Sequence, residues 1–144
     1  MAKTYAIGVV PATTTTPYVA LGSKTGGHER TYLSNFTLAA QAIADEIVVL
    51  RPNPGEIFLS AKINLSVTLA TSTVQLKQYD VTGTFVRNLT SALAFTVAYI
   101  WTEHPALNLA IGSRLDGGEI RLSIAALALP AAGNVWYDVV TTGY

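Results

Sequence analysis

The chain has 144 residues, a formal net charge of zero and no cysteine; charged residues make up 12% of it and hydrophobic residues 50%. This length is typical of one domain, and the absence of cysteine excludes disulfides and thiolate chemistry. The nine basic residues are scattered singly, so no basic stripe follows a phosphate backbone and nucleic acid is not an expected ligand. The longest uncharged apolar-rich segment, 88–102, is shorter than the ~20 residues of a membrane helix, so no membrane span is expected.

Charged residues are scarcer here than in most soluble domains, where they reach about 25%. A soluble domain normally carries mixed charges over its surface. The composition therefore suggests that neighbouring subunits cover part of this surface, although a neutral secreted β-domain rich in Ser and Thr also fits. The N-terminus shows no apolar stretch with a cleavage site, so no secretory signal is expected.

The first part of the chain, 1–36, is predicted to be an extended N-terminal arm. It holds Pro11, Pro17, the four threonines Thr13 to Thr16 and the Gly-rich stretch GSKTGGHE, without a sustained helical or strand period. Proline and β-branched threonine favour extended backbone. Such an arm is either disordered or laid across another subunit, with 3–30 as the crossing part.

From residue 37 onward the pattern predicts a domain built of strands, 37–144. TLAAQAIAD at 37–45 suits a helical turn or an irregular strand, and EIVVL at 46–50 is a buried strand closed by the turn RPNPGE. The segment 57–69 alternates apolar and polar residues, which indicates a long strand with one buried face. A tight connection then predicts a hairpin with the strand 73–79.

In the following part, a turn at Thr82 and Gly83 precedes the short strand FVRNL. Residues 91–102 alternate again, with large residues on one side and small ones on the other, which favours a strand over a helix and a close approach by another layer. The large residues are Leu93, Phe95, Val97, Tyr99 and Trp101.

Toward the C-terminus, 107–111 is predicted to be a short strand, LDGGE a turn before the strand 120–124, and VWYDVV at 135–140 the last strand. About eight strands with short turns and little helix indicate an all-β antiparallel sandwich, with a jelly roll as the expected form. Alternation does not encode strand order, so an immunoglobulin-like sandwich stays open.

No residue pattern supports catalysis, a metal site or a cofactor, and the chain is predicted not to be an enzyme. His28 and His104 lack a second His or Cys at metal-ligand spacing, and Glu103 points away from its neighbour His104 on a strand. The Gly-rich stretch lacks the order of a phosphate-binding loop, and no nucleophile-elbow motif is present.

The candidate interface follows from the polar side of the long strand. This side carries Ser, Thr and Asn and one charge, Lys62, so it can pack against protein without burying unpaired charge. Trp136 is expected to face outward together with Asp138, as a ligand or interface anchor, whereas most other aromatics are expected in the core. The interface hypothesis includes Thr13, Thr14, Thr15, Thr16, Ser60, Asn64, Ser66, Thr68 and Trp136.

The order of features resembles that of virion proteins of tailed bacteriophages, over about residues 35 to 144. The stretches that carry this likeness are DEIVVL, RPNPGE, SVTLATSTVQL and VWYDVVTTGY, after a Thr/Gly-rich arm. The resemblance implies a jelly-roll or β-sandwich subunit, often trimeric, that decorates or cements a capsid or lies in the neck or tail. It transfers no functional residues.

The expected function is therefore a capsid decoration protein that forms a homotrimer and binds the major capsid protein or other virion subunits. It would be made in the host cytoplasm and carried in the virion. The alternative is a carbohydrate-binding or host-adsorption module of a phage tail or a secreted protein, acting through exposed aromatics such as Trp136.

Overall fold

The computed structural model describes residues 3–5 and 29–143, which form nine strands. No helix in this part of the chain is long and apolar enough to cross a membrane. The strands are β1 (Lys3–Tyr5), β2 (Glu29–Thr37), β3 (Glu46–Leu50), β4 (Ile57–Leu65), β5 (Thr73–Tyr79), β6 (Phe85–Asn88), β7 (Thr102–Glu103), β8 (Glu119–Ala125) and β9 (Asn134–Thr142).

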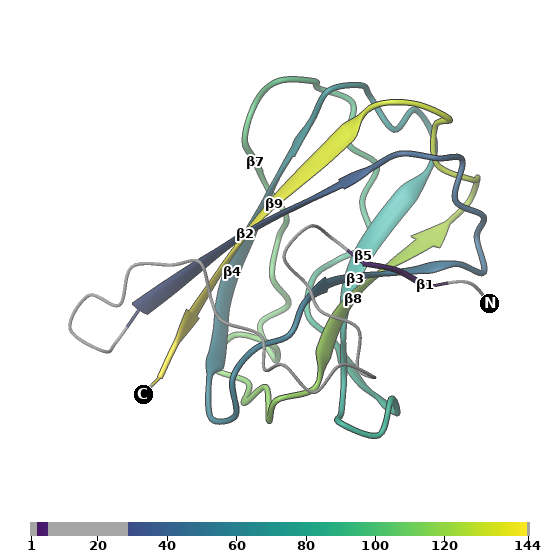
Figure 1. Cartoon of the computed structure of the whole chain (residues 1–144). Coiled ribbons are helices and arrows are strands. Elements are labelled where there is room, and N and C mark those ends of the chain that lie inside the picture. Colours follow the sequence, from purple (N-terminus) through teal and green to yellow (C-terminus); the bar gives the residue numbers. More distant parts are fainter. Residues whose placement is uncertain (1–2, 6–28, 144) are drawn as a thin grey trace.

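The strands form two sheets that pack as layers (Figure 1). One sheet has the order β2-β9-β4-β7, and the other has the order β1-β3-β8-β5-β6. All pairs are antiparallel except β1 with β3. From β2 to β9 the chain changes sheets at every connection except the β5–β6 hairpin. This strand order is that of a jelly roll, so the predicted fold class is confirmed and the immunoglobulin-like order is excluded.

The core lies between the sheets, and β5 and β9 bury every second residue toward it. Val135, Tyr137 and Val139 alternate along β9 with less buried neighbours, as the sequence predicted. Together with Tyr137, Tyr32 of β2 and Phe58 of β4 are the largest fully buried side chains. They belong to one core with apolar residues of β3, β5 and β8. Burial of each such side chain stabilises the fold by roughly 1.5–3 kcal/mol.

The long strand predicted at 57–69 is shorter and less regular than its pattern suggests. It ends at Leu65, and a bulge between Phe58 and Ser60 shifts its alternation. Phe58 is therefore fully buried, while Leu59 is only half-buried. The bulge accommodates one extra residue in β4 opposite β9.

The predicted hairpin between the strands now seen as β4 and β5 is wrong. β4 pairs with β9 and β7, while β5 pairs with β8 and β6 in the other sheet. The connection 66–72 therefore passes from one sheet to the other, and Leu69 within it is buried in the core.

Two further predicted strands, 91–102 and 107–111, are not strands apart from Thr102, which begins β7. Residues 91–101 run irregularly, held by bonds such as Leu93 N to Val74 O and Tyr99 N to Leu65 O, and 107–111 forms turns. Of the large residues predicted to share one side of this stretch, Phe95 is buried, but Val97, Tyr99 and Trp101 are exposed. The expectation that Tyr99 and Trp101 belong to the core is therefore wrong.

The segment 29–36, assigned to the arm from the sequence, forms most of β2 and pairs along its whole length with β9. Apart from β1, which pairs with β3, the described strands of the sandwich begin at Glu29. The rest of the predicted arm, apart from β1, lies outside the described residues.

Candidate interface

The polar side predicted for the long strand lies on the outside of the β2-β9-β4-β7 sheet, and we call this surface the outer sheet face. Residues paired directly across antiparallel strands point to the same side, so the partners of Trp136 and Asp138 share their face. The outer sheet face comprises Leu33, Asn35, Ser60, Lys62, Asn64, Glu103, Trp136, Asp138 and Val140.

Trp136 lies in the middle of this face, between two amide side chains. It is paired with Asn35 of β2 on one side and with Asn64 of β4 on the other. The indole is half-buried, as predicted for a residue that alternates with the core positions of β9. An aromatic ring flanked by amides offers apolar area together with hydrogen-bonding groups.

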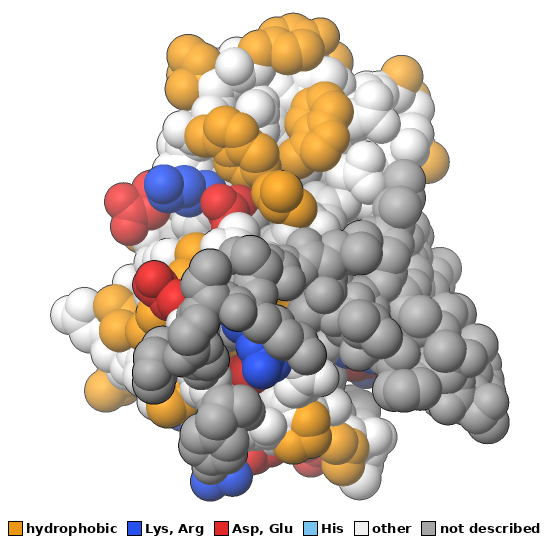
Figure 2. All heavy atoms as spheres, turned by 60° about the vertical axis from the view of Figure 1, so that its left-hand side comes forward, with side chains coloured by type: hydrophobic (Ala, Val, Ile, Leu, Met, Phe, Trp, Pro, Cys, Tyr) orange, Lys and Arg blue, Asp and Glu red, His pale blue; other side chains and the backbone are white. Residues whose placement is uncertain are grey.

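The next row of the face carries its charges. Asp138 is paired with Leu33 and Lys62, and Lys62 is paired with Glu103 at the β7 edge. The signs alternate across the strands, so each carboxylate has Lys62 as its neighbour in the row. Figure 2, turned toward the side on which β2, β9 and β4 lie in Figure 1, shows hydrophobic side chains gathered beside a small group of acidic and basic ones.

Two acceptors on this face lack donors among the described residues. The Oδ1 atoms of Asn64 and Asp138 are buried without a hydrogen bond. Burial raises the pKa of the Asp138 carboxyl, and the charge of Lys62 opposes this effect. A buried acceptor without a donor costs about 1–3 kcal/mol.

The structure brings together only some of the residues in the interface hypothesis. Ser60, Asn64 and Trp136 share the outer sheet face. Ser66 lies beyond the end of β4, where its Oγ accepts a 2.7 Å hydrogen bond from Asn134 N, and Thr68 is exposed in the following loop. Thr13 to Thr16 lie outside the described residues.

Sequence reasoning missed Leu33 and Asn35 because it placed them in the arm. The hydropathy of TYLSNFT does not alternate, because Leu33 is apolar but exposed and Ser34 is polar but buried. The aromatic and β-branched residues of this stretch were the available strand signal.

A buried carboxylate, Glu56, joins the start of β4 to β2. Tyr32 Oη donates to both of its oxygens, at 2.5 and 2.6 Å, Arg30 Nη1 donates at 2.7 Å, and Asn53 N donates at 3.0 Å. Burial raises the pKa of Tyr32, with the bond to Glu56 as the second cause. Because the carboxylate is satisfied by these donors, the cluster has a structural role.

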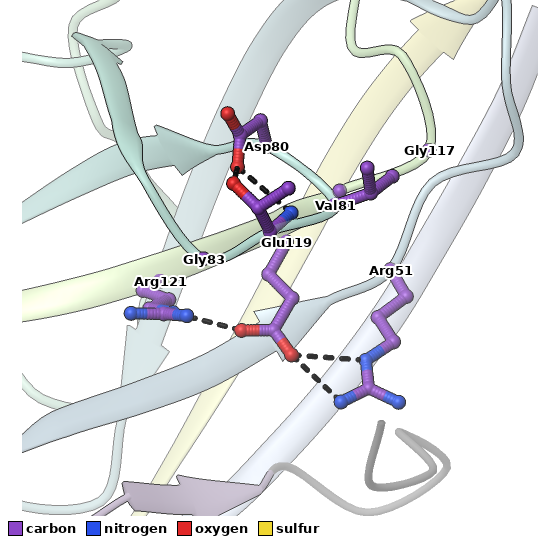
Figure 3. A pocket seen from close by; sticks show the side chains of 9 residues that line it. Arg51, Asp80, Val81, Gly83, Gly117, Glu119 and Arg121 are labelled. Atoms are coloured by element: carbon purple, nitrogen blue, oxygen red, sulfur yellow. Dashed lines mark hydrogen bonds and ion pairs between the residues drawn. The ribbon is translucent and has the colours of Figure 1, made fainter. Parts of the chain in front are cut away.

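A second cluster lies on the outside of the other sheet, beside a hollow of about 280 Å³ (Figure 3). Glu119 of β8 bridges Arg121 and Arg51 at 2.8 and 2.7 Å, and Arg121 also bonds Glu46 at 2.8 Å. The Arg121 guanidinium stacks on the Tyr79 ring at 3.9 Å. Burial raises the pKa of Tyr79 to about 12, with the hydrogen bond to Glu46 adding to it. These groups pair with one another and tie β3, β5 and β8 together.

The comparisons with known proteins bear on the fold. No family model and no curated protein matches the chain. Among solved structures, a chain of the cyanophage Pam1 capsid asymmetric unit is similar, with a TM-score of 0.60 and 20% sequence identity. The match covers 94% of this chain and 100% of that chain. The two therefore share the whole jelly-roll architecture.

Proposed function

We propose that the chain is a structural protein of a tailed-bacteriophage virion, most specifically a capsid decoration or cement protein. The observation that carries this proposal is the end-to-end structural likeness to a chain of a phage capsid asymmetric unit. Because the whole of that chain is covered, the likeness extends beyond a shared sheet motif. The scarcity of charge and the outer sheet face support the same reading.

The proposed mechanism is burial of sheet faces and of the N-terminal arm against other virion subunits. The subunits would form a homotrimer in the host cytoplasm and then bind the major capsid protein. Amide and hydroxyl side chains such as Asn35, Asn64 and Ser60 suit this purpose, since burying them costs less than burying unpaired charge.

The test is co-sedimentation of the purified full-length chain with capsid shells of its own virus that lack it. We expect saturable binding at a fixed ratio to the capsid subunits. Trp136→Ala should weaken this binding, and deletion of 6–28 should weaken it further. Unchanged binding after the deletion would remove the arm from the mechanism, and no binding by the wild-type chain would overturn the proposal.

A second function, carbohydrate binding, is favoured by one observation, the position of Trp136 between Asn35 and Asn64. Sugars stack their apolar faces on aromatic rings while amides bond their hydroxyls. A glycan array probed with the wild-type chain and with Trp136→Ala tests it. Binding that the substitution abolishes would favour this function, and a blank array would count against it.

A further inference from the structure

The exposed large hydrophobic side chains are concentrated in one stretch of the chain. Nine of the thirteen among the described residues fall within 85–111. We call these nine residues the edge strip. They are Phe85, Val86, Val97, Tyr99, Ile100, Trp101, Leu107, Leu109 and Ile111.

The edge strip follows one edge of the sandwich. β6 is the last strand of one sheet and β7 the last strand of the other, and 89–101 connects them. The strip reaches one end of β4 where Tyr99 N bonds Leu65 O, and the other end where Gly112 N bonds Phe58 O. In Figure 1 the chain beside β7 runs along the length of the molecule between these ends.

The strip exposes more apolar area than is usual for a monomer. With roughly 150–250 Å² for a large side chain and exposed fractions from 37% to 92%, the nine residues expose on the order of 900 Å². The largest apolar patch of a typical monomer is about 300–600 Å², and larger exposed patches mark protein–protein contact sites. The exposed apolar area of the strip therefore favours a protein partner.

Charge and backbone geometry also favour a protein partner of the same kind. The segment 85–111 carries two charges of opposite sign, Arg87 and Glu103, so two copies can approach without like-charge repulsion. Tyr99, 74% exposed, has a φ of 60°, which is unfavourable for a bulky residue. Strain that holds an aromatic ring out toward solvent is a mark of a functional position.

The strip has two flanks, one beside each sheet. Trp101 directly precedes β7, the last strand of the sheet that contains β4, and Tyr99 N bonds Leu65 O at the end of β4. Phe85 is paired with Tyr79 and lies on the outside of the other sheet. Two different patches on one subunit are what a ring with head-to-tail contacts requires, whereas a two-fold dimer pairs one patch with itself.

We propose that the edge strip is the contact between copies of this chain, with the Tyr99–Trp101 flank of one copy packing on the Phe85–Val86 flank of the next to close a three-copy ring. This inference rests on the oligomer in the proposed function and gives it a surface. It places the contact at the β6–β7 edge and leaves the outer sheet face for other virion subunits.

The test measures the native mass of full-length wild type, Tyr99→Asp and Phe85→Asp by light scattering after size exclusion. Wild type should be a trimer, and each variant should associate more than about tenfold more weakly. Aspartate tolerates positive φ, so Tyr99→Asp should keep the fold. Phe85 also contacts the Tyr79 ring, so Phe85→Asp could lower the melting temperature. If it does, Val86→Asp replaces it in the test.

Mixing the two variants tests the head-to-tail arrangement. Each retains one intact flank, so an equimolar mixture should form pairs of one copy of each, and neither variant alone should do so. Absence of these pairs would overturn the arrangement. As matched controls, Val81→Asp and Leu127→Asp alter exposed apolar residues outside the strip and should leave the mass of a trimer unchanged.

A monomeric wild type, or single variants that remain trimeric, would overturn the inference. The co-sedimentation assay separates this result from failure of the proposed function. Wild type that binds capsids as a monomer would remove the edge contact and leave the virion role standing. A trimer that binds no capsid would support the edge contact and overturn the virion role.

Discussion

At the scale of single residues, His104 is held neutral inside the sandwich. Its Nε2 donates to Ser91 O at 2.8 Å, which leaves Nδ1 to accept from Tyr137 Oη at 3.2 Å. Burial lowers the pKa of this imidazole from 6.5 to about 4, against the smaller opposing effect of bonds to backbone carbonyls. Since the folded state disfavours the proton, folding should weaken in acid.

We predict that His104 makes the protein less stable between about pH 6.5 and pH 4. In this window the unfolded chain binds a proton that the folded chain does not, so stability is full above pH 6.5 and falls by up to about 3 kcal/mol by pH 4. Urea unfolding at a series of pH values measures this loss. His104→Gln retains all other titrating groups, including Asp138, whose raised pKa acts in the opposite direction. Equal pH slopes in the two proteins would contradict the prediction.

At the scale of elements, the start of β8 passes so close to the end of β5 that only glycine fits. A Cβ built on Gly118 would lie 1.9 Å from Tyr79 O and 2.8 Å from the Asp80 backbone. We predict that Gly118→Ala lowers the free energy of unfolding by about 2–3 kcal/mol or more, because backbone must move. Thermal and urea unfolding measure the change.

Gly112→Ala is the matched control for this substitution. Gly112 has a φ of +83° and nothing within 4 Å of its built Cβ, so alanine there meets conformational strain alone. The expected loss is about 1–2 kcal/mol. A loss for Gly118→Ala no larger than that for Gly112→Ala would contradict the prediction, because it would mean that the backbone accommodates the methyl group without a steric cost.

How far the sequence predicts each element depends on whether alternation there reflects a paired strand. β5 and β9 alternate and have a neighbour on both sides, so their buried residues could be predicted. Residues 91–101 alternate equally well, but in this stretch a single bridge, between Leu93 and Val74 of β5, is the extent of the pairing with a strand, and β7 closes that edge of its own sheet. Alternation reports side-chain order and not pairing, which is why the exposed Tyr99 and Trp101 were expected inside.

The same limit applies to the candidate interface. Trp136, Ser60 and Asn64 could be placed on one face from the period of their strands, but their row-by-row neighbours depend on register with β2 and β7. Nothing in a single strand's sequence states which other strand pairs with it. The edge strip was beyond prediction for this reason, since it combines the edges of two sheets.

At the scale of the whole molecule, most exposed large hydrophobic side chains of the described residues lie away from the polar groups of the outer sheet face, with Leu33 as an exception. The outer sheet face carries amides, hydroxyls and the row Asp138, Lys62 and Glu103, and the β6–β7 edge carries most of the exposed large hydrophobic side chains of the described residues. A subunit that must contact both its own copies and a different protein needs two such surfaces. The apolar one suits permanent contacts and the polar one suits contacts made later.

This division predicts how salt acts on the oligomer. Contacts along the edge strip involve only Arg87 and Glu103 as charges, so screening has little to weaken, and salts that strengthen apolar burial should favour association. The native mass at low protein concentration should therefore stay constant or rise as ionic strength increases from about 0.05 to 1 M, where the Debye length shrinks to about 3 Å. Val81→Asp, outside the strip, should follow the same curve as wild type. Dissociation at high salt would mean that ion pairs hold the copies together, and the contact would then have to lie on the charged row of the outer sheet face rather than along the β6–β7 edge.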